Sequence, residues 1–351
     1  ISSSVWCAVL WVAAAVAETP APTALELFER EIQSVFQSAQ PAVVKVHAYR
    51  RAAPLDPLMR PLHKVGSGFF LRADGVVVTA AIVVGDADTC WLEWNDQQLP
   101  AQIVGQCPRV NVAVLRTPAR NGGFPAPKIA SHAELPVGSL VMAVGFPYDK
   151  PVAPSAGFVL GRDIQCGPRL FPTSHWRTSC KLSPGQTGGP LLNARGEVVG
   201  LVVAAHMDDQ SYALPIAAVQ KVADDLLEIG QPRHPWVGLD VTEREVPLTL
   251  HAGKQYEVSV REVIPNTPAA RGGFRERDRI QRIGTNEVRR LCDVLDTIFL
   301  HRPGDEVVFS ILRDGTEHTL RLTVGTRPAP SAPSTIAAPP VLPEWKPVGQ
   351  D

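Results

Sequence analysis

The sequence predicts a mainly β protein with two domains, a larger β-rich domain followed by a small α+β domain. The chain of 351 residues contains 33 Pro and 27 Gly, a composition that favours many turns and short strands over long helices. Short β-rich runs, bounded by Gly, Pro, Asn or Asp, follow one another over residues 41–230. So many strands with almost no helix between them indicate an antiparallel β-barrel or sandwich.

Helical spacing of apolar residues appears at both ends of this β-rich region. Residues 22–38 read as one amphipathic helix, and residues 217–230 read as a closing helix that stops at Gly230. We assign residues 18–40 to an N-terminal helical segment.

A second group of strands occupies residues 233–325. It includes a short helical turn at the run TPAARGGF and a helix over residues 288–301, which together predict a small α+β domain. The tail, residues 326–351, is rich in Pro and Ala, and we expect it to be disordered or extended.

The overall composition is that of a soluble globular protein. Hydrophobic residues make up 45% of the chain, charged residues 20%, and the formal net charge is −1. A nucleic-acid binder needs a basic footprint, and the sequence contains no block of Lys or Arg. We therefore expect no nucleic-acid partner. No cluster of metal ligands and no nucleotide-binding loop is visible, so we expect no metal and no cofactor.

The N-terminus suggests export. Residues 5–17 form an uncharged apolar run that ends in Ala15-Val16-Ala17, a pattern typical of the end of a signal peptide. We interpret residues 1–17 as a signal-peptide remnant; a buried strand or an uncleaved anchor is the alternative. No later stretch is apolar enough to span a membrane. The mature protein is expected in the periplasm or outside the cell.

Export would permit disulfides. Cys90 and Cys107 flank an apparent hairpin with its turn at residues 95–98, and Cys166 and Cys180 flank another short excursion. We expect the pairs 90–107 and 166–180, with Cys292 free. The alternative is that these cysteines are small buried apolar residues.

The sharpest local motif is the run from Gly185 to Leu191, GQTGGPL, between two strand-like segments. A tight Gly-rich turn lets backbone N–H groups converge on one point, and in acyl-transfer enzymes that point holds the oxyanion beside the nucleophile. The run resembles G-N-S-G-G-P-L of the trypsin-like serine proteases. The resemblance implies that Gly185, Gln186 and Thr187 form an oxyanion-hole-like turn, with Thr187 at the nucleophile position. The bland alternative is that the fold needs this turn for packing.

Other segments resemble the HtrA/DegP family of trypsin-like proteases. Residues 66–69 (GSGF) and 76–84 (VVVTAAIVV) resemble the family's G-S-G-F and I-L-T-N-N-H-V-V, which aligns Ile82 with the catalytic His. The run 111–116 (NVAVLR) resembles D-L-A-V-L-K, which aligns Asn111 with the catalytic Asp. The resemblance implies a trypsin-like double β-barrel over residues 41–230 in which Ile82, Asn111 and Thr187 occupy all three triad positions.

These replacements predict loss of catalysis. Isoleucine cannot accept a proton, and a threonine hydroxyl without an adjacent base is a poor nucleophile. Activity would require a relocated base, for which His63, His175 and His206 are the candidates by chain position.

Residues 233–325 resemble the PDZ domain that follows the protease in HtrA proteins. The match rests on PWVGL (235–239), VIPNTPAA (263–270) and GFRERDRI (273–280), in which Arg277 stands where a Gly is usual. The resemblance implies capture of a peptide C-terminus by β-augmentation. The expected peptide-binding residues are Trp236, Val237, Gly238, Leu239, Leu291, Leu295 and Ile298.

Three functions remain open at this stage. The first is a non-catalytic binder of peptide C-termini or unfolded exported proteins, acting in quality control or regulation. The second is an active endopeptidase that uses Thr187 with a relocated base. The third is a structural subunit that assembles with active HtrA relatives. The resemblance also implies a homo-trimer formed through the N-terminal segment, where Phe28 and Phe36 are candidate contacts.

Overall fold

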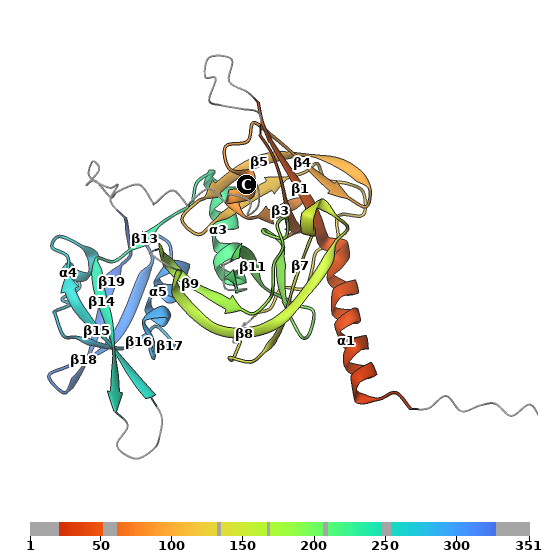
Figure 1. Cartoon of the computed structure of the whole chain (residues 1–351). Helices are drawn as coiled ribbons and strands as arrows, with labels where there is room; N and C mark the ends of the chain where they lie inside the picture. The colour runs from red at the N-terminus through yellow and green to blue at the C-terminus, as the bar shows by residue number, and fades with distance from the viewer. Residues whose placement is uncertain are drawn as a thin grey trace, which may run out of the picture.

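The computed structural model describes residues 21–51, 62–131, 135–166, 169–205, 210–247 and 254–327. Two closed β-barrels lie next to each other, and a smaller C-terminal domain packs beside the second barrel (Figure 1). The expected signal-peptide remnant and almost all of the expected disordered tail lie outside the described residues. The expected mainly β architecture, a double barrel followed by an α+β domain, is confirmed.

The first barrel closes in the strand order β1-β2-β3-β6-β5-β4. Its strands are β1 (Val43–Arg50), β2 (Leu62–Phe70), β3 (Val76–Thr79), β4 (Thr89–Trp94), β5 (Gln97–Cys107) and β6 (Val112–Arg116). The β4–β5 hairpin turns at Asn95 and Asp96, whose positive φ angles of 48° and 58° suit a tight two-residue turn. The short helix α2 (Ala81–Val84) follows β3 and leads toward the junction of the barrels.

The second barrel closes in the order β10-β11-β12-β9-β8-β7. Its strands are β7 (Leu140–Gly145), β8 (Ala153–Cys166), β9 (Arg169–Thr178), β10 (Pro190–Asn193), β11 (Val198–Ala205) and β12 (Ser211–Pro215), and a 3₁₀ turn, η2 (Pro147–Asp149), follows β7. One apolar cluster spans both barrels and the helix after them, with Phe69, Leu192 and Leu226 among its buried members. The two barrels therefore share a core and form one unit.

Both expected flanking helices are present. Helix α1 (Ala24–Ala39) begins at a capping box, because the Thr23 hydroxyl accepts from the Glu26 amide and the Glu26 carboxylate accepts from the Thr23 amide. A 3₁₀ turn, η1 (Gln40–Ala42), joins it to β1. Helix α3 (Ile216–Ile229) ends at Gly230 in the left-handed conformation, as the sequence indicated. No helix in the described ranges is long and apolar enough to cross a membrane.

The C-terminal domain is built on the sheet β14-β15-β16-β18-β19, with β17 beside β16. Its strands are β14 (Leu239–Pro247), β15 (Lys254–Val263), β16 (Arg279–Ile283), β17 (Asn286–Glu287), β18 (Glu306–Arg313) and β19 (Thr316–Thr323). A two-stranded ribbon of β13 (Pro235–Trp236) and β20 (Gly325–Thr326) closes it, with helices α4 (Pro268–Arg271) and α5 (Leu291–Leu300). Among the strands of the described ranges, β14 pairs with β15 alone, so it is an edge strand.

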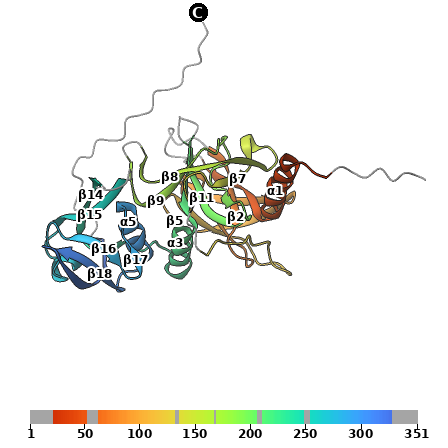
Figure 2. The same ribbon diagram turned by 90° about the horizontal axis from the view of Figure 1, so that it is seen from below.

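Helix α5 is the element that joins this domain to the second barrel, and it packs mainly on β9. The Asp296 carboxylate accepts hydrogen bonds from the Thr173 hydroxyl (2.7 Å), the Ser174 amide (2.6 Å) and the Ser174 hydroxyl (2.5 Å). Arg162 of β8 pairs with Asp293. Helix α1 lies on the opposite side of the barrels from the C-terminal domain in both views (Figures 1 and 2).

The expected disulfides are wrong. Cys90, Cys107 and Cys180 are free and buried, as is Cys292. In the β4–β5 register Cys90 faces Ala101, and its side chain packs in the first barrel's own core, whereas Cys107 packs in the shared core. Cys166 pairs with Arg169 near the turn of the β8–β9 hairpin, while the backbone of Cys180 follows Ser179 at the other end, opposite Phe158. The alternative interpretation, small buried apolar residues, describes Cys90, Cys107 and Cys180.

Candidate functional site

The three positions aligned with the triad meet where the barrels join. The Ile82 amide donates to the side-chain oxygen of Asn111 over 2.8 Å, and the Thr187 carbonyl accepts from the Ser67 amide on β2 over 2.9 Å. Gly188, which follows Thr187, lies so near the end of β3 that an added Cβ would be 3.0 Å from the Ala80 nitrogen. Residues from α2, the β5–β6 connection and the Gly-rich turn are thus brought to one place.

Ile82 presents an apolar side chain to solvent, with 62% of its surface exposed. Its backbone is held on both sides, because its amide donates to Asn111 and its carbonyl accepts from Lys64 Nζ at 3.4 Å. Helix α2 therefore has its backbone fixed, yet the side chain at this position has no group that could accept or relay a proton.

Asn111 acts as a clamp between the barrels. Its backbone is left-handed, with φ 59°, a conformation that asparagine tolerates better than most residues. Its side-chain oxygen accepts from the Ile82 amide, while its Nδ2 donates to the carbonyl of Val203 on β11 over 2.7 Å. This pair of bonds requires a donor and an acceptor on one side chain, which an amide has and an ionised carboxylate lacks.

The Gly-rich turn is shaped by close backbone approach. Gly185 and Gly188 have φ angles of 97° and 93°, and a Cβ on Gly188 would lie 2.1 Å from the Ser67 carbonyl oxygen. The Gln186 side chain is buried and anchors the turn, since its oxygen accepts from the Ser183 amide (2.8 Å) and its Nε2 donates to the Ala153 carbonyl (3.4 Å). The Gln186 amide donates to the Ser183 carbonyl over 3.1 Å, so both the side chain and the N–H group of Gln186 are engaged within the turn.

Neither of the two candidate relocated bases that the structure describes, His63 and His175, is paired with Thr187. The Thr187 hydroxyl has no hydrogen bond to any residue in the described part of the chain. His63 lies on the outer side of β2, where its Nε2 is 3.1 Å from His47 Nδ1 and its ring stacks with Trp91. His175 is buried against the Phe171 ring, 3.9 Å between centroids. His206 lies outside the described residues.

A second candidate site lies between the C-terminal domain and the barrels. A cavity of about 600 Å³ is within the size range of ligand pockets. Its lining contains every residue that the sequence predicted for peptide binding: Trp236, Val237, Gly238, Leu239, Leu291, Leu295 and Ile298. The edge strand β14 and helix α5 form one wall. The β8–β9 hairpin forms the other with Ile164, Leu170, Phe171 and Pro172.

Gly238 gives this groove its shape. It has φ 80°, and a Cβ there would lie 2.3 Å from the Thr267 side chain. The Ile264 amide donates to the Gly238 carbonyl, which fixes the turn before β14. On α5, Leu291 and Ile298 also pack against the domain's core, whereas Leu295 lines the groove without belonging to that core cluster. Leu295 is therefore the helix residue whose position the core does not explain.

Sequence reasoning missed three polar residues in the lining of this groove. They are Arg109, His234 and Arg327. Burial lowers the pKa of the Arg109 guanidinium, and the nearby charge of Arg327 lowers it further. Burial also lowers the pKa of His234, with the charges of Arg109 and Lys221 adding to the effect. No local motif joins these residues, because they come from separate parts of the chain.

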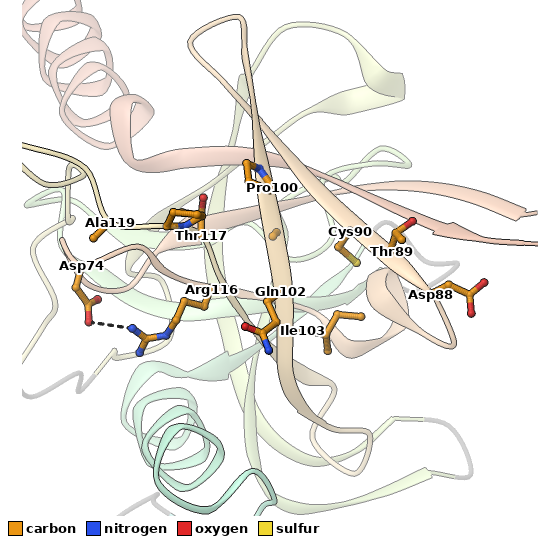
Figure 3. Close-up of a pocket in the computed structure, with 12 residues that line it drawn as sticks. Asp74, Asp88, Thr89, Cys90, Pro100, Gln102, Ile103, Arg116, Thr117 and Ala119 are labelled. Atoms are coloured by element: carbon orange, nitrogen blue, oxygen red, sulfur yellow. Dashed lines mark ion pairs between the residues drawn. The ribbon is translucent and has the colours of Figure 1, made fainter.

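A larger cavity, about 690 Å³, lies on the outer side of the first barrel (Figure 3). It is lined by the start of β4, the middle of β5 and the segment after β6, and an Asp74–Arg116 ion pair of 3.8 Å crosses one edge. Burial raises the pKa of the Cys90 thiol in its wall to about 11, which keeps the sulfur protonated and unreactive at neutral pH. This cavity contains none of the positions aligned with the triad.

Comparison with known families identifies both domains. Residues 66–201 match the family described as trypsin-like peptidase domain, and residues 235–324 match the PDZ domain family. The chain thus consists of a trypsin-like peptidase domain followed by one PDZ domain.

Two curated relatives indicate which kind of peptidase the chain is similar to. A probable periplasmic serine endoprotease DegP-like of Pseudomonas fulva is 30% identical over 282 residues, and one of Halomonas elongata is 30% identical over 274. These matches cover 77% and 75% of this chain but only 57% of each relative, so the chain spans less than two thirds of the curated relatives it matches.

Among solved structures, the HtrA-type protease AlgW with a tripeptide aligns with a TM-score of 0.64 at 25% identity, over 85% of this chain and 98% of that one. The serine endoprotease from Yersinia pestis has a TM-score of 0.55 at 22% identity, over 84% of this chain and 98% of that one, and supports the fold alone. In its domain order the chain is similar to these DegP-like and HtrA-type proteases.

Proposed function

We propose that this protein is an HtrA-type pseudoprotease that binds peptide C-termini through its PDZ domain. The observation that carries the proposal is the side chain of Ile82, an exposed alkyl group at the position of the general base. Asn111 supports it, because its amide donates to the Val203 carbonyl and the residue at position 82 is Ile rather than a histidine for it to orient. Thr187 has no described partner that could take its proton. A hydroxyl without a base is a weak nucleophile.

Peptide capture is the function that remains. The groove offers an unpaired edge strand, β14, for main-chain hydrogen bonds, and an apolar wall on α5 for a side chain. Relatives of this fold have been solved with a tripeptide or a decapeptide bound, as with AlgW. We propose that the natural ligands are the C-termini of unfolded or processed exported proteins, since the relatives are named as periplasmic.

Assembly belongs to the same proposal. Leu25 and Phe28 on α1 are 74% and 52% exposed, whereas Phe36 packs against the shared core. Of the two aromatic contacts that the sequence suggested, only Phe28 presents an exposed apolar face. We propose that this face of α1 supports self-association as a trimer, or mixed assembly with an active HtrA relative.

One experiment separates the binder from the protease. Purified protein and its Thr187→Ala variant are incubated with unfolded casein beside an active HtrA protease, and labelled peptides are titrated by fluorescence anisotropy. We expect no cleavage by either form and peptide binding by both. Leu295→Glu should weaken peptide binding about tenfold or more because it places a charge in an apolar wall, while Leu300→Glu at the exposed end of the same helix should leave it unchanged. Cleavage that disappears in Thr187→Ala would overturn the proposal.

A further inference from the structure

Helix α5 and the edge strand β14 are joined by an acidic side chain of the strand. The Glu243 carboxylate accepts a hydrogen bond from the Leu291 amide at the start of α5 over 2.7 Å and another from Arg290 Nε over 2.9 Å. A carboxylate is favoured there because the first amides of a helix carry partial positive charge. The Arg290 guanidinium lies over the Tyr256 ring, 4.2 Å from its centre, which holds it in place. We call this bonded pair, Glu243 and Arg290, the strap.

The strap lies just past the end of the peptide groove. Of the described residues of β14, those that line the groove are Leu239, Asp240 and Val241, three of the nine in the strand. The free edge of β14 continues to Pro247. Glu243 follows Val241 by two residues, so both side chains lie on the same face of the strand. The groove therefore ends well before the edge strand does, and it ends next to the strap.

The Glu243 side chain lies across the path that a longer peptide would take. A strand that adds to β14 has to run between β14 and α5. With its chain end at the turn before β14, an antiparallel peptide runs from Leu239 toward Glu243. The backbone of Glu243 belongs to β14 while its carboxylate touches α5, and its side chain is only 18% exposed. The side chain therefore fills the space that a fourth or fifth peptide residue would need.

We propose that the strap limits the groove to about the last three residues of a peptide, so that Glu243 and Arg290 set the length of chain that the PDZ domain recognises. This inference rests on the proposed peptide-binding function and adds the ligand class: chain ends recognised through three residues, with no contribution from the sequence before them. The strap has a second effect on the rest of β14. It places charged groups beside an exposed edge strand, which discourages pairing with other chains.

Opening the strap should lengthen the site. Without the Glu243 carboxylate, the unpaired main-chain groups of residues 242–247 become available to a peptide that is already bound by its end. Each added main-chain hydrogen bond contributes a modest gain in affinity. A long peptide should therefore gain from the change, whereas a tripeptide should not.

The test uses the full protein and unlabelled peptides of three, five and eight residues. Two series end in Leu-Thr-Leu and in Val-Ser-Phe, with uncharged extensions of Thr, Val and Ser. Affinities are measured by isothermal titration calorimetry for wild type, Glu243→Ala, Arg290→Ala and the control Glu257→Ala. Glu257 is a matched control because it pairs with Arg244 and Arg279 outside the groove lining, and its side chain is 21% exposed. Thermal unfolding shows that each variant is folded, and hydrogen exchange reports protection of the β14 amides beyond Val241.

For wild type and Glu257→Ala we expect the three lengths to bind within about twofold of one another. In Glu243→Ala the eight-residue peptides should bind about threefold to tenfold more tightly than the tripeptides, with new protection in residues 242–247, and Arg290→Ala should show a smaller gain of the same kind. The same length dependence in wild type and Glu243→Ala would overturn the inference and leave the proposed peptide binding intact. Failure of wild type to bind any of the peptides would overturn the proposed peptide binding itself, and the inference with it.

Discussion

The side chain of Asn111 forms two hydrogen bonds that connect elements on either side of the barrel junction. Its oxygen accepts from the Ile82 amide and its Nδ2 donates to the Val203 carbonyl. A carboxylate of the same size could make the first bond, but it would place a negative oxygen 2.7 Å from the Val203 oxygen. The amide therefore stabilises the junction in the absence of a histidine at position 82.

We expect Asn111→Asp to lower the free energy of unfolding at pH 7 by about 1–3 kcal/mol, because a buried acceptor loses its donor. Urea unfolding followed by tryptophan fluorescence measures the change. The loss should become smaller in acid, where a protonated carboxyl can again donate to Val203. Asn266→Asp is the control, since Asn266 lies in an exposed turn, and its change should stay within about 0.5 kcal/mol. Equal losses of unfolding free energy in the two variants would contradict the stabilising role assigned to the Asn111 amide.

Helix α5 shows what an element contributes beyond its own domain. One face carries Leu295 and Ile298 into the peptide groove, and another carries Asp293 and Asp296 onto the second barrel. The helix therefore couples the groove to the barrel through three hydrogen bonds on one carboxylate. A change in the seating of α5 would alter both faces together.

We expect Asp296→Ala to release the PDZ domain from the barrel without unfolding it. Hydrogen bonds to a charged group contribute about 1.5–3 kcal/mol each, so the docked state should lose a large part of its stability. Limited proteolysis should then cut the linker near residue 232 faster than in wild type. Asp314→Ala, in an exposed turn, serves as the control. Unchanged cleavage rates in Asp296→Ala would show that other contacts hold the domain.

The helices and the residues of the peptide groove were largely predictable from sequence, because short sequence motifs specify them. Helix α3 stops at Gly230 as expected, and the residues predicted for peptide binding line one cavity. Helix α5 begins at Leu291, three residues later than the apolar pattern suggested, because the Asp293 carboxylate accepts from the Arg289 and Arg290 amides and caps it there.

The contacts that the sequence did not predict join residues that lie far apart along the chain. Arg109 and Arg327 approach one groove, and Asp296 meets Ser174, across more than a hundred residues, so no spacing rule links them. The disulfides failed for a related reason. Flanking a hairpin does not make two cysteines neighbours, because the strand register gives Cys90 a different partner.

A buried carboxylate forms a second link between the barrels and the PDZ domain, in addition to the contacts of α5. Asp225 on α3 is fully buried and pairs with Lys221 of its own helix, with Arg233 in the linker and with Arg302 beyond α5. Barrel, linker and PDZ domain thus meet at one charge. Burial acts to raise the pKa of Asp225, but bonds from Lys221 Nζ and the Arg233 amide outweigh it and hold the pKa below the ordinary 3.8.

The sign of the pH effect follows from this lowered pKa. Asp225 stabilises the folded state fully above its ordinary pKa, and this stabilisation is lost as the pH falls through the lower folded-state value. We expect the free energy of unfolding to fall as the pH drops below about 4, the ordinary pKa of an aspartate. In Asp225→Asn this part of the pH dependence should be absent, and stability at pH 7 should drop by about 3–5 kcal/mol because Lys221 stays buried without a counter-charge. Asp314→Asn should keep the wild-type pH profile; a wild-type profile in Asp225→Asn would contradict the assignment.

The crowded turn at Gly188 bears on how inactive relatives of proteases are recognised. Its backbone lies against Ser67 and Thr79 so closely that any side chain would collide, whether or not the neighbouring hydroxyl reacts. Selection for a folded barrel alone would keep such a glycine. A sequence search that matches this Gly-rich turn therefore detects the fold. Whether a protein can hydrolyse peptides has to be judged from the side chains at the triad positions, which packing does not dictate.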